Sequence, residues 1–182
     1  MKVITLTKRH LTLALALCLA AVIMAVSAGV AVQAKRLIPI YCVETDKKVV
    51  ALTFDAAWGN EDTSQLIEIL GRHNAKATFF VVGEWVDKYP ESVKQLHDAG
   101  HQVQNHSDDH PDMATISKEQ ILKRLNACND KVEAITGVRP NLFRAPFGSY
   151  NNNLINATDS LKMHTIQWDV ELYATVGNVR KY

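Results

Sequence analysis

After residue 48, short apolar runs alternate with longer two-faced segments. The short apolar runs predict strands at 49–54, 77–82, 101–105 and 164–170. Apolar residues at helical spacing predict helices at 61–71, 85–100, 117–136 and 154–161. Strands that alternate with helices require crossover connections and a parallel sheet, so the predicted fold class is α/β.

The residues suited to chemistry follow the predicted strands. Val49–Phe54 is apolar at nearly every position, which predicts a strand buried on both faces, and Asp55 comes directly after it. His106 follows the strand at 101–105, and Arg144 opens the loop after Phe143. Because active sites of parallel α/β folds lie at the carboxyl ends of the strands, we expect the site there.

A separate segment precedes this pattern. Lys8 and Arg9 are followed by an uncharged apolar run from Leu11 to Val32, which is typical of an export signal. The run is about long enough to span a bilayer, and small residues around Ala28 and Ala34 offer cleavage sites, so a cleaved signal peptide and a retained membrane anchor both remain open. The basic flank places the rest of the chain outside the cytoplasm, at the outer face of the membrane or in the cell wall.

The remaining composition fits one globular domain. The 182 residues carry a formal net charge of +1, and we expect neither a nucleic-acid partner nor a protein partner. Cys42 and Cys128 lack metal-binding spacing, while a disulfide between them stays open for an exported chain. Cys18 lies inside the apolar run and is interpreted as a membrane-buried thiol.

The segment Asn105–Pro111 carries two imidazoles. His106 and His110 stand four residues apart, can face the same way on a helical turn, and can supply two nitrogen ligands to one divalent metal. Asp108 and Asp109 are candidates for further ligands or for partners that orient the imidazoles. Taken alone, the cluster is equally well explained as a solvated loop.

Two more positions could serve a hydrolytic site. Asp55 could act as a general base near a metal, although an aspartate there can also simply cap the next helix. Arg144 lies in a Pro- and Gly-containing loop and could hold a carboxylate through a bidentate contact, while a backbone amide near Phe147 could face an oxyanion. A surface arginine beside a turn is the alternative interpretation.

Together these motifs resemble those of the polysaccharide deacetylases with the NodB homology domain, especially the sporulation-type branch. The resemblance depends on Thr53-Phe54-Asp55, His106-Ser107-x-x-His110-Pro111 and Arg144-Ala145-Pro146-Phe147-Gly148, in that order. It runs from about Val49 to Val170. It implies a distorted, incomplete (β/α) barrel of the polysaccharide deacetylase type.

The resemblance also implies a role for each matching residue. His106 and His110 would bind a divalent metal, usually Zn²⁺ with Co²⁺ as an alternative, but Ala56 replaces the acidic residue that completes the family's metal site. Asp55 would be the general base and Arg144 would tether it. The backbone amide of Phe147, where the family usually has Tyr, would donate to the oxyanion. The substrate pocket would be lined by Trp58, Pro146, Trp168 and Asp169.

The implied reaction is metal-dependent removal of N-acetyl groups from amino sugars of a cell-wall polysaccharide, either peptidoglycan or a chitin-like polymer. Metal-activated water would attack the acetamide carbonyl while Asp55 completes its deprotonation. The metal and a backbone amide would stabilise the tetrahedral oxyanion. The alternative is a catalytically impaired glycan-binding or vestigial deacetylase domain.

The resemblance weakens after Val170. Trp168-Asp169-Val170 begins the family's fourth motif, but the following residues do not continue it, and the later Leu-x-His motif that supplies the general acid is absent. This favours a truncated or frameshifted domain with an exposed sheet edge. The expected organisation is a signal peptide or membrane anchor at 1–34, a lead-in at 35–48, and a deacetylase domain at 49–182 that lacks its C-terminal part. The other histidines of the domain are expected at the surface (His73, His97, His101) or away from the site (His164).

Overall fold

The computed structural model describes residues 8–29, 35–171, 174–175 and 178–179, with side chains for 8–22 and 35–171. Contacts divide the chain into one unit that ends at Lys35 and a second that begins at Arg36. The first unit contains helix α1 (Lys8–Gly29). None of the helices in these described ranges combines the length and apolarity that a membrane span needs. The predicted export signal lies partly outside the described residues, and it remains a prediction.

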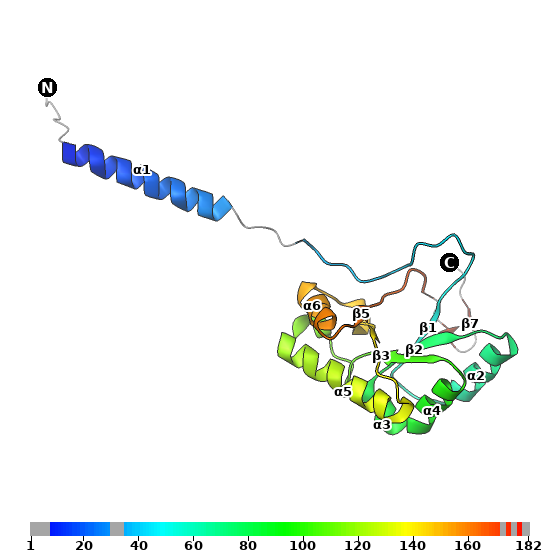
Figure 1. The fold of residues 1–182 in the computed structure, drawn as a ribbon. Coiled ribbons are helices and arrows are strands. Elements are labelled where there is room, and N and C mark those ends of the chain that lie inside the picture. The colour runs from blue at the N-terminus through cyan, green and yellow to red at the C-terminus, as the bar shows by residue number, and fades with distance from the viewer. Residues whose placement is uncertain (1–7, 30–34, 172–173, 176–177, 180–182) are drawn as a thin grey trace. The chain divides into compact units, whose positions relative to one another are not determined.

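The second unit is built on a five-stranded parallel sheet in the order β1-β2-β3-β4-β5 (Figure 1). The strands are β1 (Leu52–Ala56), β2 (Ala77–Val81), β3 (Gln102–Asn105), β4 (Leu142–Phe143) and β5 (His164–Thr165). A small antiparallel pair follows, β6 (Ala174–Thr175) with β7 (Asn178–Val179). The predicted α/β class is confirmed, and the described strands form an open sheet, as expected of an incomplete barrel.

Helices connect the strands, and Figure 1 shows α2 to α5 along one face of the sheet. The helices are α2 (Thr63–Arg72), α3 (Gly83–Lys88), α4 (Pro90–Asp98), α5 (Lys118–Thr136) and α6 (Asn152–Ser160), with short 3₁₀ turns η1 (Met113–Thr115) and η2 (Pro146–Gly148). The prediction for α5 is confirmed at both ends. The Ser117 hydroxyl accepts a hydrogen bond from the Gln120 amide, and Gly137 takes the left-handed conformation that ends the helix.

The single helix predicted over 85–100 is wrong. Two helices, α3 and α4, meet at Tyr89, whose backbone is non-helical (φ −130°, ψ 54°). Pro90 causes the break, because its ring disfavours helical geometry in the residue before it, while Pro90 itself suits the first position of α4.

Two apolar clusters fill the space between sheet and helices. The larger one joins β2 and β3 to α2, α3, α4 and α5, and the second joins β4 to α5 and α6. Because side chains alternate along a strand, Phe79 and Val81 of β2 belong to the larger cluster, while Phe80 lies against the Arg144 guanidinium. The alternation therefore gives β2 one face for the helices and one for the candidate site.

Three predictions about the edges of the sheet and its surroundings need correction. The first strand begins at Leu52, so Val49 and Val50 lie outside it and are exposed. β1 itself is an edge strand that pairs with β2 alone among the described strands. The strand predicted over 164–170 ends at Thr165. On the free side of β5, the Ile40 amide of the lead-in segment (35–48) donates to the Thr165 carbonyl (2.9 Å). The lead-in segment therefore covers part of the sheet edge that was expected to be exposed.

The structure also corrects the prediction for His101 and decides the open question of a disulfide. His101 is buried (5% exposed) rather than at the surface, and its Nδ1 accepts a hydrogen bond from the Ala77 amide (3.3 Å). The disulfide left open between Cys42 and Cys128 is absent, since Cys42 is exposed and Cys128 is buried on α5, both as free thiols.

Candidate active site

The carboxyl ends of the strands bring three predicted residues together. Asp55 lies in β1, His106 follows β3 and Arg144 follows β4. The strands are in parallel register at this end, with Ala56 opposite Val81, Val81 opposite Asn105, and Asn105 opposite Phe143. Residues 89 positions apart in sequence therefore contact one another.

Arg144 fixes the carboxylate of Asp55. Its Nη1 donates to Asp55 Oδ1 (2.7 Å), and its Nη2 donates to the Thr53 hydroxyl (2.8 Å). The guanidinium lies 4.2 Å from the Phe80 ring centroid and 5.5 Å from that of Trp168. The Arg144 side chain is 4% exposed and that of Asp55 37%, so a buried cation orients a carboxylate that still reaches solvent.

His106 is oriented by the backbone. Its Nδ1 lies 2.8 Å from the Arg144 carbonyl oxygen, which can only accept, so Nδ1 carries the proton and Nε2 keeps its lone pair. Nε2 lies 3.9 Å from Asp55 Oδ2. Burial lowers the pKa of His106, although Asp55 and the carbonyl oppose this effect. The imidazole is therefore neutral at neutral pH, the form that can bind a metal ion.

His110 faces His106 across a tight turn. The ring centroids are 4.9 Å apart, and the backbones of Ser107 (φ 69°) and His110 (φ 53°) are left-handed. The Ser107 hydroxyl closes the turn by accepting from the His110 amide (3.0 Å). The pairing of the two imidazoles that the four-residue spacing predicted is thus present, on a turn rather than on a helix.

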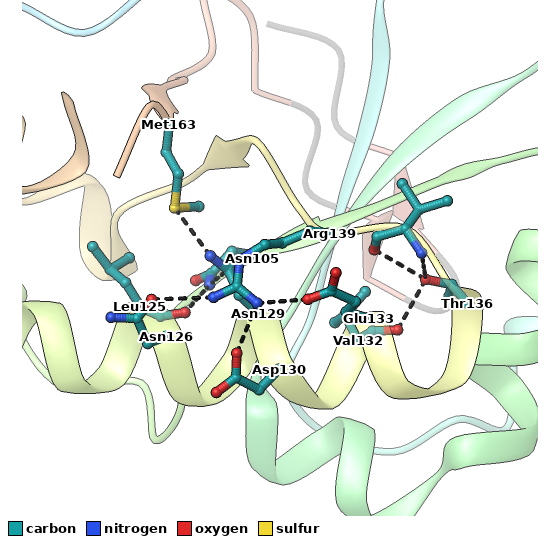
Figure 2. Close-up of polar contacts among 11 residues, drawn as sticks. Asn105, Leu125, Asn126, Asn129, Asp130, Val132, Glu133, Thr136, Arg139 and Met163 are labelled. Carbon is teal, nitrogen blue, oxygen red and sulfur yellow. Dashed lines mark hydrogen bonds and ion pairs between the residues drawn. The ribbon is translucent and has the colours of Figure 1, made fainter. Parts of the chain in front are cut away.

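Asn105 anchors this turn from inside the core. Its amide group donates to the Leu125 carbonyl (2.9 Å) and to Asn129 Oδ1 (2.8 Å), both on α5, as Figure 2 shows. Its Oδ1 accepts from the Ser107 amide (2.8 Å). Asn105 is fully buried, and these three hydrogen bonds satisfy both ends of its side chain.

The expected roles of Asp108 and Asp109 are not what the structure shows. Asp108 forms an ion pair with Lys131 (2.6 Å) and Asp109 forms one with Arg124 (2.8 Å). Both cations belong to α5, and no described hydrogen bond joins either carboxylate to an imidazole. The two acidic residues tie the turn to α5 instead of extending the ligand set.

The residues predicted for the pocket lie in different environments. Trp58 (82% exposed) and Phe147 (70% exposed) pack edge-on against the His110 ring, with ring centroids 5.3 and 4.8 Å from it. Trp168 covers the guanidinium of Arg144, and Pro146 is buried in η2. Asp169 is exposed and takes part in no hydrogen bond or ion pair among the described residues.

Phe147 has a left-handed backbone (φ 60°) in η2. Its amide donates no hydrogen bond among the described residues, whereas the next two amides donate to Ala145 and Pro146. The amide expected to serve an oxyanion is therefore left available by the turn.

The residues present supply only part of a metal site. A catalytic zinc site usually has three protein ligands. His106 fits one position well, since a backbone carbonyl holds Nδ1 and leaves Nε2 available, and His110 lies beside it. Across the described residues, however, no three His, Cys, Asp or Glu side chains are grouped so as to hold a metal ion. Two ligands fit, and Ala56 stands where the resemblance expects the third.

Three contributors to the site were not assigned a role from the sequence. Thr53 and Phe80 contact Arg144, and the Gln167 carbonyl lies 3.5 Å from its Nη2. Thr53 had a detectable signal, because it lies two residues before Asp55 and so shares its face of the strand. Phe80 and Gln167 had none, since their proximity depends on how the strands pair.

The open parallel sheet and the polar residues at its carboxyl edge define an α/β protein with a site suited to hydrolysis. Residues 43–166 match the family model described as polysaccharide deacetylase. The chain therefore belongs to the polysaccharide deacetylase family.

Individual relatives support this assignment. The uncharacterized protein YlxY of Bacillus subtilis (strain 168) is 37% identical over 133 residues, which are 73% of this chain and 42% of YlxY. The peptidoglycan-N-acetylmuramic acid deacetylase PdaA of the same organism is 36% identical over 131 residues, 71% of this chain and 50% of PdaA. The chain thus spans about half or less of the length of these relatives.

A solved structure adds a contrast. Wild-type BA3943, a CE4 family pseudoenzyme from Bacillus anthracis, superimposes with a TM-score of 0.70 at 40% identity, over 72% of this chain and 47% of BA3943. A BA3943 mutant described as having restored enzymatic activity gives the same TM-score at 41% identity, over 72% of this chain and 48% of that chain. The chain is therefore similar both to named deacetylases and to a protein of the same fold described as a pseudoenzyme.

Proposed function

We propose that this chain removes N-acetyl groups from amino sugars of a cell-wall polysaccharide, either peptidoglycan or a chitin-like polymer. The observation that carries the proposal is the convergence of Asp55, His106 and Arg144, with Asp55 held by Arg144 at 2.7 Å and facing His106 at 3.9 Å. Relatives named peptidoglycan deacetylases support the substrate class. The resemblance to the sporulation-type branch suggests a link to sporulation.

Each residue has a defined task in this proposal. Asp55 takes a proton from the attacking water, because Arg144 occupies Oδ1 and leaves Oδ2 for this purpose. The Phe147 amide donates to the oxyanion. Trp58, Pro146, Trp168 and Asp169 line the pocket. His106 and His110 would hold a divalent metal, Zn²⁺ or Co²⁺, which when bound supplies Lewis-acid chemistry.

The proposed site of action is outside the cell. The basic and apolar N-terminal sequence would export the domain and then either be cleaved or remain as a membrane anchor. In both cases the domain would meet cell-wall glycan directly.

A second candidate function is glycan binding with little or no turnover. It is favoured by Ala56, by the two-imidazole donor set and by the similarity to a pseudoenzyme. The two candidates share the fold and the substrate class, and they differ in whether acetate is released.

The test measures acetate release from N-acetylglucosamine oligomers and from peptidoglycan, with added Zn²⁺ or Co²⁺. The proposal expects release by the wild type, and a rate about 10² to 10⁴-fold lower in Asp55→Asn, the range attributed to a general base. Equal rates in the two proteins would refute catalysis. Calorimetric binding of the oligomers that persists in His106→Ala without acetate release would support the second candidate.

A further inference from the structure

The segment that carries both imidazoles, residues 106–110, has a backbone that needs support. Ser107 and His110 both have positive φ angles, at 69° and 53°. Residues with side chains rarely adopt this conformation, and such a backbone persists only where its surroundings hold it. What surrounds this segment therefore decides where the imidazoles point.

Helix α3 holds the segment through its backbone. The Gly83 amide donates to the Ser107 carbonyl (3.0 Å), and the Glu84 amide donates to the Asp108 carbonyl (2.9 Å). A Cβ atom on Gly83 would lie 3.1 Å from Asp108 Cα and closer still to its carboxylate. The close approach of α3 to the segment thus requires glycine at position 83.

Helix α5 holds the same segment through charge. Lys131 Nζ lies 2.6 Å from Asp108 Oδ1 and 2.7 Å from Asp87 Oδ2, and Asp87 belongs to α3. One α5 cation therefore joins the segment to α3. Burial alone would lower the pKa of Lys131, but the hydrogen bonds and charges of Asp108 and Asp87 outweigh it and leave this pKa raised. The bridging group therefore stays charged at neutral pH.

We infer that Lys131 is a positioning residue for the two imidazoles: by joining Asp108 to Asp87 it locks residues 106–110 against α3 and α5. Lys131 makes no contact with the imidazoles and acts on them through Asp108 alone. This inference rests on the proposed function only in assuming that the two imidazoles are important for activity. The contacts that hold the imidazoles in place do not depend on that function.

The test uses the full-length, metal-free chain and compares Lys131→Met with Lys123→Met. Lys123 is exposed on the same helix and forms no ion pair among the described residues, so it is a matched control. Two-dimensional NMR of the ¹⁵N-labelled imidazoles should show shifted ring signals of His106 and His110 in Lys131→Met only. Hydrogen exchange of the Glu84 and His110 amides should accelerate about tenfold, the effect of losing a charge-assisted hydrogen bond.

Three further comparisons separate positioning from a general effect on folding. Lys131→Arg should restore the wild-type ring signals. Asp108→Asn should reproduce the Lys131→Met shifts, and the double variant should add little, because both act through one contact. Asp87→Asn keeps Asp108 paired, so it should give a smaller shift of the same signals even if Lys131→Met folds poorly.

Unchanged ring signals in both Lys131→Met and Asp87→Asn, or equal shifts in Lys123→Met, would overturn the inference. These readouts need neither metal nor turnover. A chain that releases no acetate can therefore still confirm the positioning role, and an active enzyme can still disprove it.

Discussion

Replacing Arg144 by methionine tests whether the buried ion pair stabilises the fold. Methionine keeps a flexible apolar side chain between Phe80 and Trp168 but removes the charge and the donors to Asp55 and Thr53. A hydrogen bond to a charged group contributes about 1.5 to 3 kcal/mol. The Asp55 carboxylate that remains is 37% exposed and can be hydrated. The decrease in the free energy of unfolding should therefore stay below the roughly 3 to 5 kcal/mol that is typical when a buried charge loses its partner.

We therefore expect Arg144→Met to lower the free energy of unfolding by about 2 to 3 kcal/mol. For a domain of this size the midpoint of thermal unfolding should fall by roughly 4 to 12 °C. Urea unfolding followed by tryptophan fluorescence, with an unchanged m-value, gives the measurement.

Removing the carboxylate of Asp55 should lower the free energy of unfolding more than removing the guanidinium of Arg144. In Asp55→Ala the guanidinium of Arg144 loses its carboxylate partner, and the Arg144 side chain is only 4% exposed. The free energy of unfolding should therefore fall by about 3 to 5 kcal/mol. The order of the two losses follows from which partner is left in the interior.

Arg139 provides the matched control. It forms ion pairs with Asp130 (2.7 Å) and Glu133 (2.6 Å), as Figure 2 shows, but its side chain is 42% exposed. Arg139→Met should lower the free energy of unfolding by no more than about 1 kcal/mol, although Arg139 forms two ion pairs and Arg144 only one. Equal losses for the two arginines, or a smaller loss for Asp55→Ala than for Arg144→Met, would refute the argument from burial.

Three further predictions follow from single sites. Ala56→Asp should bind Zn²⁺ at least about tenfold more tightly than the wild type by competition with a chelating dye, and the neutral control Ala56→Asn should not, because only the carboxylate adds a charged donor. Burial raises the pKa of the Cys128 thiol to about 12, so native protein should take up iodoacetamide at the other two cysteines alone until it is unfolded; rapid native labelling of Cys128 would contradict this. Burial lowers the pKa of His101, so the unfolded chain binds more protons and stability should fall as the pH drops below about 6.5; His101→Leu should reduce this slope in urea titrations, and an unchanged slope would contradict the argument.

Local signals in the sequence were sufficient to predict which segments form helices and which form strands, and where several of these elements begin and end. Ser117 and Gly137 predicted both ends of α5, because capping is a short-range interaction between a side chain or a glycine and the neighbouring backbone. The alternation of strands and helices predicted the parallel sheet, and with it the edge on which Asp55, His106 and Arg144 meet. The motif order added the roles proposed for these residues.

Other features depended on neighbours that are distant in sequence. Val49 and Val50 are apolar, yet they are exposed, because they precede β1 and no neighbouring strand pairs with them. His101 is a polar residue whose burial depends on packing beside Phe79 and the Ala77 amide. Neither outcome is visible in a local window, since burial depends on which strands become neighbours.

The sequence by itself determined the period of each element, the caps of α5, and the placement of Asp55, two imidazoles and Arg144 at the carboxyl ends of strands, because each of these depends on a few adjacent residues. Only the tertiary structure decided that Asp108 and Asp109 contact α5 instead of the imidazoles, and that Arg144 is buried against Phe80. In the unfolded chain, a charged side chain can pair with any of several partners at similar free energy. The packed arrangement of helices around the sheet selects one of them, because it fixes both the distance and the burial of each charge.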